Sequence, residues 1–496
     1  MRRNDLWVYR RSNLAIMTLA AMSLCAASAA ATQQDGLGAD RANSVVITDV
    51  TVLPMTRGSS VLRNRSVLVT GGRIARIAQA SVFKGPAGVA VIDGRGKYLM
   101  PGLADMHIHM ENDEILAKIY PGKAPVGVFK TADLSLPYVA NGVLQLFNLS
   151  ASPAAMAQRD EIESGRVVGP HMALAVMIDG NPPLQPMANV AMTPEAGRKL
   201  VKDAATGGFE AIKTYTNLDL ATFNAVVDEA RTKHLKVLGH LPLREKDRTA
   251  ELLQPGFGMV AHAEEYAYQT PKVDTEAIPR FTSLAKRTGT WLITTVKLNE
   301  RIVEQTETID SLKSRPEMRY VNPFTYQSWT QQNSYAASAD KLPKRKSVVA
   351  FNAKLVASFH GAGVPMVVGT DSMVSGIVPG FALHDELEAL AKLGLPNGSI
   401  LAAATRAPAE YLGVIKDRGT VEVGKRADLL LLEADPLSDV ANTRKIAAVI
   451  LSGKVYPRSE LDREMAALAR RYAGPSKLAA SSVTLGGHFA PEDEND

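Results

Sequence analysis

The chain has 496 residues, of which 46% are hydrophobic, so it is long enough to form more than one folding unit around a large core. Its formal net charge of +5 at pH 7 falls to +2 without residues 1–31, which contain four arginines and one aspartate. The net charge of the remaining chain therefore does not argue for nucleic-acid binding. The only cysteine, Cys25, lies in the same segment, so the rest of the chain has neither a thiol nor a disulfide.

Residues 1–31 have the pattern of a secretory signal peptide. Four arginines precede an apolar run at 14–27, and the alanines at 29–31 offer a small-residue cleavage site before Thr32. We therefore expect a periplasmic or secreted protein, with no membrane association after signal removal, because no later apolar run has spanning length. An uncleaved anchor, and twin-arginine export through Arg10 and Arg11, stay open as alternatives.

Strand-like segments punctuated by glycine occur at both ends of the remaining chain. They lie at 45–53, 67–77, 91–94 and 97–100, and again at 419–433 and 446–456. The middle of the chain, from about 103 to 412, has a different pattern, in which short apolar strands alternate with helical stretches. Its candidate strands lie at 143–149, 172–178, 211–215, 236–239, 259–262, 291–296 and 366–369.

This alternation predicts βα units and a parallel sheet, long enough to close as a (β/α)8 barrel of the TIM type. Residues 299–343 interrupt it with a long polar insertion after the seventh strand. We interpret the insertion as an active-site cover or a helical excursion.

Histidines occur at the predicted carboxyl ends of several barrel strands. His107 and His109 follow one strand, and side chains two residues apart on a strand point the same way, which suits metal binding. This motif is weak alone, but His240 and His262 end two other strands, and Asp371 follows a third. Imidazole nitrogens and a carboxylate are ligands that zinc accepts, so the set predicts a metal centre at the barrel mouth.

Lys213 lies inside a predicted buried strand, where an ammonium group is costly unless it is paired or chemically changed. Beside metal ligands, its neutral amine could take up carbon dioxide and become a carbamate that bridges two metals. The alternative is a simple ion pair with an acid such as Asp371. Tyr215 lies two residues further on the same face, and we expect its hydroxyl to polarise a substrate carbonyl.

The order His-x-His, Lys, His, His, Asp resembles the amidohydrolase superfamily, above all its imidazolonepropionase-like branch, which includes dipeptide- and ochratoxin-cleaving enzymes. Further stretches carry the resemblance from about residue 45 to 456: PGLADMHIH (101–109), GFEAIKTY (208–215), GHLP (239–242), GTDS (369–372), HDELEAL (384–390), ATRAPAEYLG (404–413) and GTVEVGKRADLLLLEADP (419–436).

The resemblance implies two divalent metal ions, with zinc as the default. His107, His109 and Asp371 would hold the more buried ion, His240 and His262 the other, and an N6-carboxylated Lys213 would bridge them. Similar sequences often have an acid where this chain has Ala261, which leaves the orientation of His262 open.

The resemblance also implies a small β-sandwich domain built from both chain ends beside the α/β barrel. The resulting division is a signal peptide at 1–31, sandwich parts at 44–100 and 413–460, the barrel at 101–412, and a C-terminal extension at 461–496.

We therefore expect a metal-dependent amidohydrolase in which a metal-bound hydroxide attacks an amide carbonyl of a small molecule, a dipeptide or an N-acyl amino acid. Asp371 would pass the nucleophile's proton to the leaving nitrogen. Lactone, carbamate or phosphotriester hydrolysis stays open, because the same site attacks those centres. A non-catalytic metal-binding protein is disfavoured, since metal storage needs no acid-base carboxylate. A serine or cysteine hydrolase is also disfavoured, because the chain beyond residue 31 has no cysteine and the sequence has no G-x-S-x-G motif.

A substrate carboxylate would need a cation near the barrel mouth, and Lys297, at the end of the seventh predicted strand, is one candidate. His384 could contact substrate or serve only in structure. We expect a homo-oligomer and no nucleic-acid partner.

Overall fold

The computed structural model describes residues 44–83, 85–119 and 127–473. The predicted signal peptide, and most of the predicted C-terminal extension beyond residue 473, lie outside these residues. Among them, no helix has the length and apolar character needed to cross a membrane.

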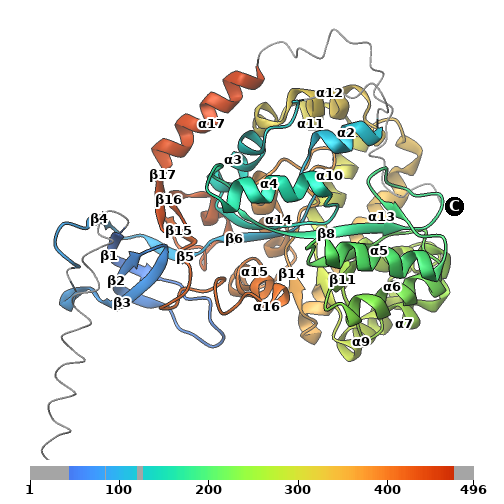
Figure 1. The fold of residues 1–496 in the computed structure, drawn as a ribbon, viewed down its shortest axis with the longest axis horizontal. Helices are drawn as coiled ribbons and strands as arrows, with labels where there is room; N and C mark the ends of the chain where they lie inside the picture. Colours follow the sequence, from blue (N-terminus) through green and yellow to red (C-terminus); the bar gives the residue numbers. More distant parts are fainter. Residues whose placement is uncertain (1–43, 84, 120–126, 474–496) are drawn as a thin grey trace, which may run out of the picture.

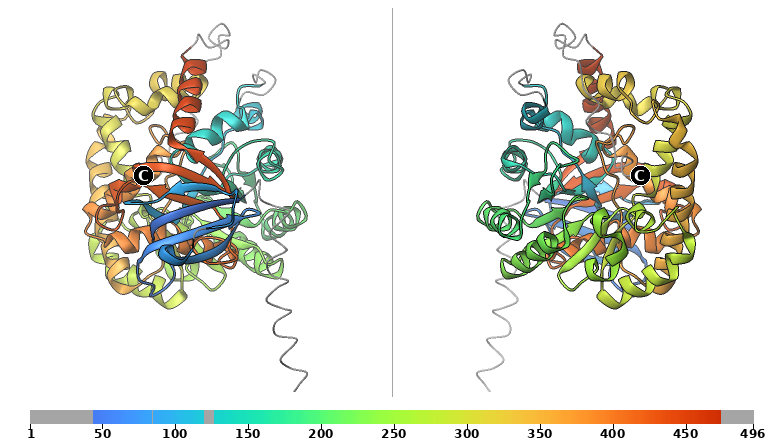
Figure 2. Two further views of the ribbon diagram at one scale, coloured as in Figure 1. Left: turned by 90° about the vertical axis from the view of Figure 1, so that its left-hand side faces the viewer. Right: turned by 90° about the vertical axis from the view of Figure 1, so that its right-hand side faces the viewer.

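The first sheet combines strands from both ends of the described chain (Figures 1 and 2). Its order is β17-β16-β15-β5-β1-β2-β3, and β4 pairs with β1. Strand β5 joins the two halves, parallel to β1 on one side and antiparallel to β15 on the other. The strands are β1 (Ser44–Val52), β2 (Leu62–Thr70), β3 (Arg73–Gln79), β4 (Ala90–Asp93), β5 (Tyr98–Pro101), β15 (Leu429–Leu432), β16 (Ile446–Leu451) and β17 (Lys454–Pro457).

The second sheet is a nearly closed barrel of eight parallel strands, which occupies the right-hand part of Figure 1. In order they are β6 (Leu103–Ile108), β7 (Val143–Asn148), β8 (His171–Asp179), β10 (Ala211–Thr214), β11 (Lys236–Gly239), β12 (Phe257–Ala261), β13 (Trp291–Ile293) and β14 (Met366–Val367), with the short β9 (Asn189–Val190) beside β8. The ring closes where the backbone N–H of Met106 donates to Val368 and that of Asp371 donates to His107.

The barrel strands are buried on both faces, so they are short apolar runs without polar alternation. Their inward residues fill the barrel, and their outward residues pack against the helices; the inward set includes Met106, Phe147, Ala175, Ala211, Leu238, Met259, Ile293 and Val367. Since side chains alternate, Lys213 and His240 lie two residues beyond inward residues and face the same interior.

Helices surround the barrel and follow its strands. They are α2 (Asp113–Ile119), α3 (Thr131–Ala140), α4 (Pro153–Glu163), α5 (Pro194–Thr206), α6 (Leu220–Thr232), α7 (Thr249–Leu252), α8 (Glu264–Tyr268), α9 (Ile278–Thr288), α14 (Phe381–Lys392), α15 (Asn397–Ala403) and α16 (Arg406–Leu412), with α17 (Arg458–Tyr472) after the last strand. Helix α9 shows why they form: Ile278, Phe281, Leu284 and Ala285 recur at helical spacing on its buried face, and Gly289 ends it in the left-handed conformation.

The predicted fold class is confirmed: a TIM-type barrel with a small β-sandwich domain from both chain ends; the residue boundaries of the domains stay predictions. The insertion is a helical excursion made of α10 (Val296–Glu307), α11 (Asp310–Lys313), the 3-10 helix η6 (Pro316–Tyr320), α12 (Pro323–Gln331) and the first part of α13 (Leu342–Ala362).

The seventh strand is shorter than the sequence predicts. It ends at Ile293, and Val296 already begins α10. The cause is Glu386 of α14, whose carboxylate accepts hydrogen bonds from the Thr294 hydroxyl and from the backbone N–H groups of Val296 and Lys297. An acid at this helix N-terminus satisfies amide groups that a continuing strand would have paired with its neighbours.

Candidate metal centre

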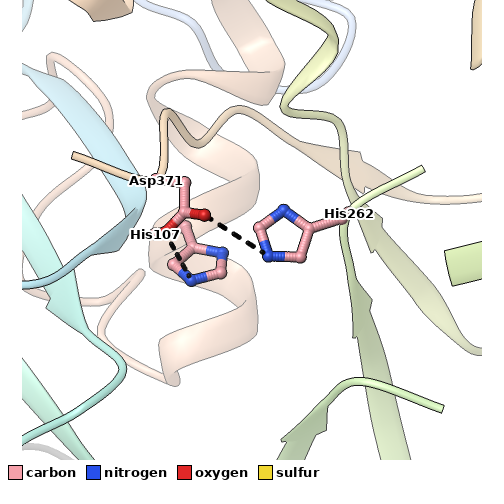
Figure 3. A group of neighbouring side chains, drawn as sticks. All are labelled: His107, His262 and Asp371. Atoms are coloured by element: carbon pink, nitrogen blue, oxygen red, sulfur yellow. Dashed lines mark ion pairs between the residues drawn. The ribbon is translucent and has the colours of Figure 1, made fainter. Parts of the chain in front are cut away.

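Three side chains from separate strands converge at the carboxyl end of the barrel (Figure 3). His107 belongs to β6, His262 directly follows β12, and Asp371 comes after β14. One possible ligand atom from each lies within 4.8 Å of the others, and all three residues are buried. The group could therefore hold a metal ion.

Asp371 lies at the centre of this group. Its Oδ1 is 3.2 Å from Nε2 of His107 and 3.0 Å from Nε2 of His109, and its Oδ2 is 3.7 Å from Nε2 of His262. The two nitrogens of the His-x-His pair are themselves 3.3 Å apart. Asp371 and His262 both have positive φ, 61° and 84°, a conformation that non-glycine residues adopt at a cost and that is often found at functional sites.

The protonation states suit metal binding. Burial and the charge of Lys213 hold the pKa of His107 well below its usual value, and the same two causes lower the pKa of His240. Burial also lowers the pKa of His262, although Asp371 opposes it. The pKa of Asp371 is raised by burial, but the hydrogen bond from His109 and nearby positive charges outweigh this and lower it to about 2. The site thus combines neutral imidazoles at His107, His240 and His262 with an ionised carboxylate, the ligand forms that divalent metals bind.

Lys213 lies within the same group of residues. Its side chain is fully buried on β10 and packs against Gly239 of β11, where an added Cβ would lie 2.9 Å from its Cδ. Its Nζ lies 5.7 Å from the centre of the Tyr215 ring, and its charge adds to the effect of burial in lowering the pKa of His107, His240 and His262. Tyr215 stacks on His240 with ring centroids 4.1 Å apart.

Four polar residues that the sequence did not reveal orient the histidines. Thr295 lies 3.0 Å from Nδ1 of His262, and Ser150 lies 2.7 Å from Nδ1 of His109. Nδ1 of His240 lies 3.3 Å from Thr216 and 3.5 Å from Glu265. Such contacts fix ring orientation and tautomer.

The contact at Thr295 answers the question raised by Ala261. Position 261 is an alanine, and His262 is oriented by Thr295, which lies between β13 and α10. Glu264 is a weaker neighbour, with its Oε1 3.8 Å from Nδ1. Thr295 itself has a φ of 41°, held by the hydrogen bonds that Glu386 accepts on either side of it.

Asp105 connects the first and last barrel strands beneath the centre. Its Oδ1 accepts from the backbone N–H of His107 and of Thr370, and its Oδ2 accepts from the Thr370 hydroxyl at 2.6 Å. Burial raises its pKa to about 7, although these hydrogen bonds oppose the shift. Asp105 therefore fixes the position of β6, which carries His107, relative to the segment after β14, which carries Asp371.

A cavity lies over the group. His109, His240, His262, Asp371 and Tyr215 line its barrel side. The remaining wall is largely apolar, with a few polar and charged groups; it comprises Met177, Gln185, Met187, Glu264, Tyr268, Leu298, Asn299, Ile302, Tyr335, Lys344, Arg345, Val348, Met373 and Val374. Several of these belong to the insertion, so that segment covers the site.

The two candidate substrate contacts, Lys297 and His384, have other partners. Lys297 does not line the cavity, because its Nζ is held by Glu300 at 2.7 Å and Glu304 at 3.3 Å on its own helix. His384 is fully buried on α14, with Nδ1 2.8 Å from the Thr443 hydroxyl and Nε2 2.9 Å from the carbonyl oxygen of Asn141. It connects the barrel to the loop before β16 and has a structural role.

Comparison with known proteins gives one family match and many similar folds. The model of the amidohydrolase family matches residues 98–456, which is more than half of the chain. A Bifidobacterium longum protein described as a prolidase has 25% identity and a TM-score of 0.63, covering 85% of this chain and 99% of that one. Bottromycin amidohydrolase has 19% identity and a TM-score of 0.67, covering 87% and 91% of the two chains.

A shorter match involves adenine deaminase 2 of Bradyrhizobium sp. (strain ORS 278). It is 39% identical over 80 residues, which is 16% of this chain and 13% of that protein. The similarity therefore concerns a small part of either sequence.

Proposed function

Since the chain belongs to the amidohydrolase family and is a hydrolase, we propose that it cleaves the amide C–N bond of a dipeptide or an N-acyl amino acid with the help of divalent metal ions. The observation that carries the proposal is the convergence of neutral imidazoles and an ionised carboxylate at the base of a cavity with largely apolar walls.

The residues fit a metal. Oδ1 of Asp371 is buried, and the Nε2 atoms of His107 and His109 lie within 3.2 Å of it, so these three side chains could share one ion. His107, His109 and Asp371 would hold one ion, His240 and His262 a second, and Lys213, carboxylated on its amine, would bridge them. Zinc is our first choice from the ligand types. When bound, the ions would activate water and polarise the scissile carbonyl.

The side chains supply proton transfer and orientation. Asp371 accepts the proton of the attacking water and donates it to the leaving nitrogen. Tyr215, fixed by stacking on His240, directs its hydroxyl towards the substrate carbonyl. The covering helices of the insertion exclude bulk water from the reacting groups.

The cavity wall supports a substrate with an apolar side chain. Three methionines, Met177, Met187 and Met373, contribute to the wall, and this flexible side chain adapts to varied apolar shapes. The descriptions of similar folds, a prolidase and a Xaa-Pro dipeptidase, agree with a peptide-like substrate.

A second candidate is hydrolytic deamination of a purine-like ring, which also breaks a C–N bond. The short similarity to adenine deaminases favours it. Lactone, carbamate and phosphotriester hydrolysis are further alternatives, because the same site would attack those centres.

Metal content and turnover test these alternatives together. We expect about two metal ions per chain by elemental analysis, and chelator-sensitive release of an amino acid from a panel of dipeptides and N-acyl amino acids. Release of ammonia from adenine without peptide cleavage would favour deamination. One metal or none, with hydrolysis of lactones alone, would contradict both the bridging lysine and the amidase.

We further propose export of the protein with removal of residues 1–31, and a homo-oligomeric mature form. N-terminal sequencing of the periplasmic or secreted protein tests the first proposal. Light scattering of the purified protein tests the second.

A further inference from the structure

Arg345 is a buried cation in the wall of the cavity over the metal centre. It lies on α13, its exposed fraction is only 7%, and it shares the cavity with His109 and Asp371. The neighbouring Lys344 also lines the cavity, but its side chain is exposed. A buried charge interacts with a ligand more strongly than an exposed one, because less water screens it.

The guanidinium group is held in a defined orientation. Its Nη1 donates to the Thr306 hydroxyl at 2.6 Å and to the carbonyl oxygen of Tyr335 at 3.2 Å, and its Cζ lies 5.3 Å from the centre of the Tyr335 ring. Thr306 belongs to α10, and Tyr335 to the loop between α12 and α13. Groups from two segments of the insertion thus fix the planar guanidinium, and a fixed guanidinium matches a carboxylate better than a flexible ammonium does.

The acidic and the basic side chains that line the cavity come from different parts of the chain. The barrel strands and the loops after them contribute the carboxylates of Glu264 and Asp371, whereas α13 contributes the cations Lys344 and Arg345. A substrate that presents its scissile carbonyl to the barrel and an anionic group to α13 complements both.

We propose that Arg345 binds the carboxylate at the non-reacting end of the substrate and thereby selects carboxylate-bearing amides. The inference rests on the proposed amidase function and identifies the residue that determines specificity. It replaces Lys297, which does not line the cavity.

The first test requires no mutation. The metal-loaded protein is given an N-acyl leucine and the matching N-acyl leucinamide, which differ only in the terminal charge, and release of the acyl group is followed. We expect kcat/KM to be roughly 100-fold higher for the acid, because the acid forms a charge-assisted contact with the buried guanidinium that the neutral leucinamide does not form. Equal values for the two substrates would overturn the proposal.

The second test compares three variants. Arg345→Met should raise KM for the acid by about the same factor and leave kcat/KM for the leucinamide within threefold, and Arg345→Lys should restore part of the preference. Lys297→Met, the matched control, should retain the full preference. Equal losses on both substrates would mean that Arg345 only supports the fold, and loss of the preference in Lys344→Met instead would assign the role to Lys344.

The two proposals fail differently. If neither substrate is cleaved, the amidase function is wrong, and calorimetric binding of the acid and the leucinamide still decides the role of Arg345. Tighter binding of the acid, lost in Arg345→Met, would support it, and equal affinities would refute it. If Arg345→Met does not fold, the comparison of acid with leucinamide on the unmodified protein remains decisive.

Discussion

At the scale of single residues, the orientation of His262 depends on Thr295, a side chain from the junction between β13 and α10. Thr295 lies 3.0 Å from its Nδ1, and the left-handed backbone at Thr295 is held by hydrogen bonds to Glu386. The imidazole therefore presents Nε2 towards Asp371 only if this neighbour is in place.

Thr295→Val should weaken metal binding at His262 by 10- to 100-fold and lower kcat accordingly, because an outer hydrogen bond to a ligand histidine has about that effect. Competition with a metal-sensitive dye measures the affinity. Thr282→Val is the matched control, since Thr282 is also a buried threonine, but its hydroxyl contacts Ser358 of α13 and not a histidine. Equal metal affinity in the two variants would contradict the prediction.

Asp371→Asn should reduce kcat by about 1,000-fold or more, since it removes the proton acceptor and a ligand in one step. Circular dichroism and the melting temperature should show that the fold persists. Near-normal turnover with normal metal content would eliminate the acid-base role of Asp371.

The site residues that could be predicted from the sequence are those that directly follow a predicted strand. His107, His240 and His262 each follow an apolar run, so their position at the barrel mouth was predictable. Thr295, Glu386 and Arg345 were not, because each acts across a contact between segments that are distant in the chain. A threonine or a helical glutamate has no sequence signal that distinguishes such a contact from an ordinary surface position.

At the scale of elements, the ends of β10 and β11 approach closely around Lys213. Gly239 has a φ of 140°, and an added Cβ would lie 2.3 Å from the carbonyl oxygen of Thr214 and 2.9 Å from Cδ of Lys213. Only glycine fits between these strand ends without moving the backbone or the lysine.

Gly239→Ala should therefore displace Lys213, lower the metal content, and destabilise the protein by a few kcal/mol. Elemental analysis and thermal melting provide the measurements. Gly361→Ala is the control, since Gly361 lies in α13 with open space around its Cα and should be neutral or slightly stabilising. A metal content in Gly239→Ala equal to that of the control would be the contrary result.

Helix α14 is connected to the insertion and to the sandwich side through Asp385. Its carboxylate binds Arg301 of α10 at 2.7 Å, Arg315 before η6 at 3.2 Å, and Arg444 of the 3-10 helix η8 (Val440–Arg444) at 2.6 Å. Burial raises the pKa of Asp385, but the hydrogen bond from Arg301 and the charges of the three arginines outweigh it and lower the pKa.

A lowered pKa means that the ionised form stabilises the fold above the ordinary value of 3.8, and that this contribution is lost as the pH falls through the folded-state pKa. Asp385→Asn should reduce the free energy of unfolding by about 3–5 kcal/mol at pH 7. Its difference from the unmodified protein should shrink as the pH falls below 3.8.

Melting temperatures across this pH range provide the measurement. Glu388→Gln, which removes a more exposed partner of Arg444, should cost less than about 1 kcal/mol. A pH-independent difference between Asp385→Asn and the unmodified protein would rule out the carboxylate's charge as the cause.

The elements themselves were largely predictable, because buried parallel strands and amphipathic helices have distinct apolar periodicities. The early end of the seventh strand is an exception. It arises because Glu386, ninety positions away, accepts hydrogen bonds from the first backbone amides of α10, at Val296 and Lys297. The path of the insertion over the barrel was also beyond sequence reasoning, because its helices pack through scattered contacts such as that between the hydroxyl of Thr325 and the carboxylate of Glu111.

At the scale of the whole molecule, the ligands come from strands spread between β6 and β14, so a bound metal would connect nearly the entire barrel. Chelation of metal should lower the melting temperature by several degrees, because a ligand that binds only the folded state stabilises it by several kcal/mol at saturation. Differential scanning calorimetry with and without chelator tests this, and re-addition of the metal should restore the original value. An unchanged melting temperature after complete metal removal would contradict the prediction.

The first sheet has a consequence for synthesis. Strand β5 gains its antiparallel neighbour β15 only after more than three hundred further residues have left the ribosome. Until then one edge of β5 stays open, and an open edge is a template for pairing with other chains. A chain that terminates before β15 would therefore carry a complete barrel sequence and an unfilled sheet, and should be found among aggregates and proteolytic fragments.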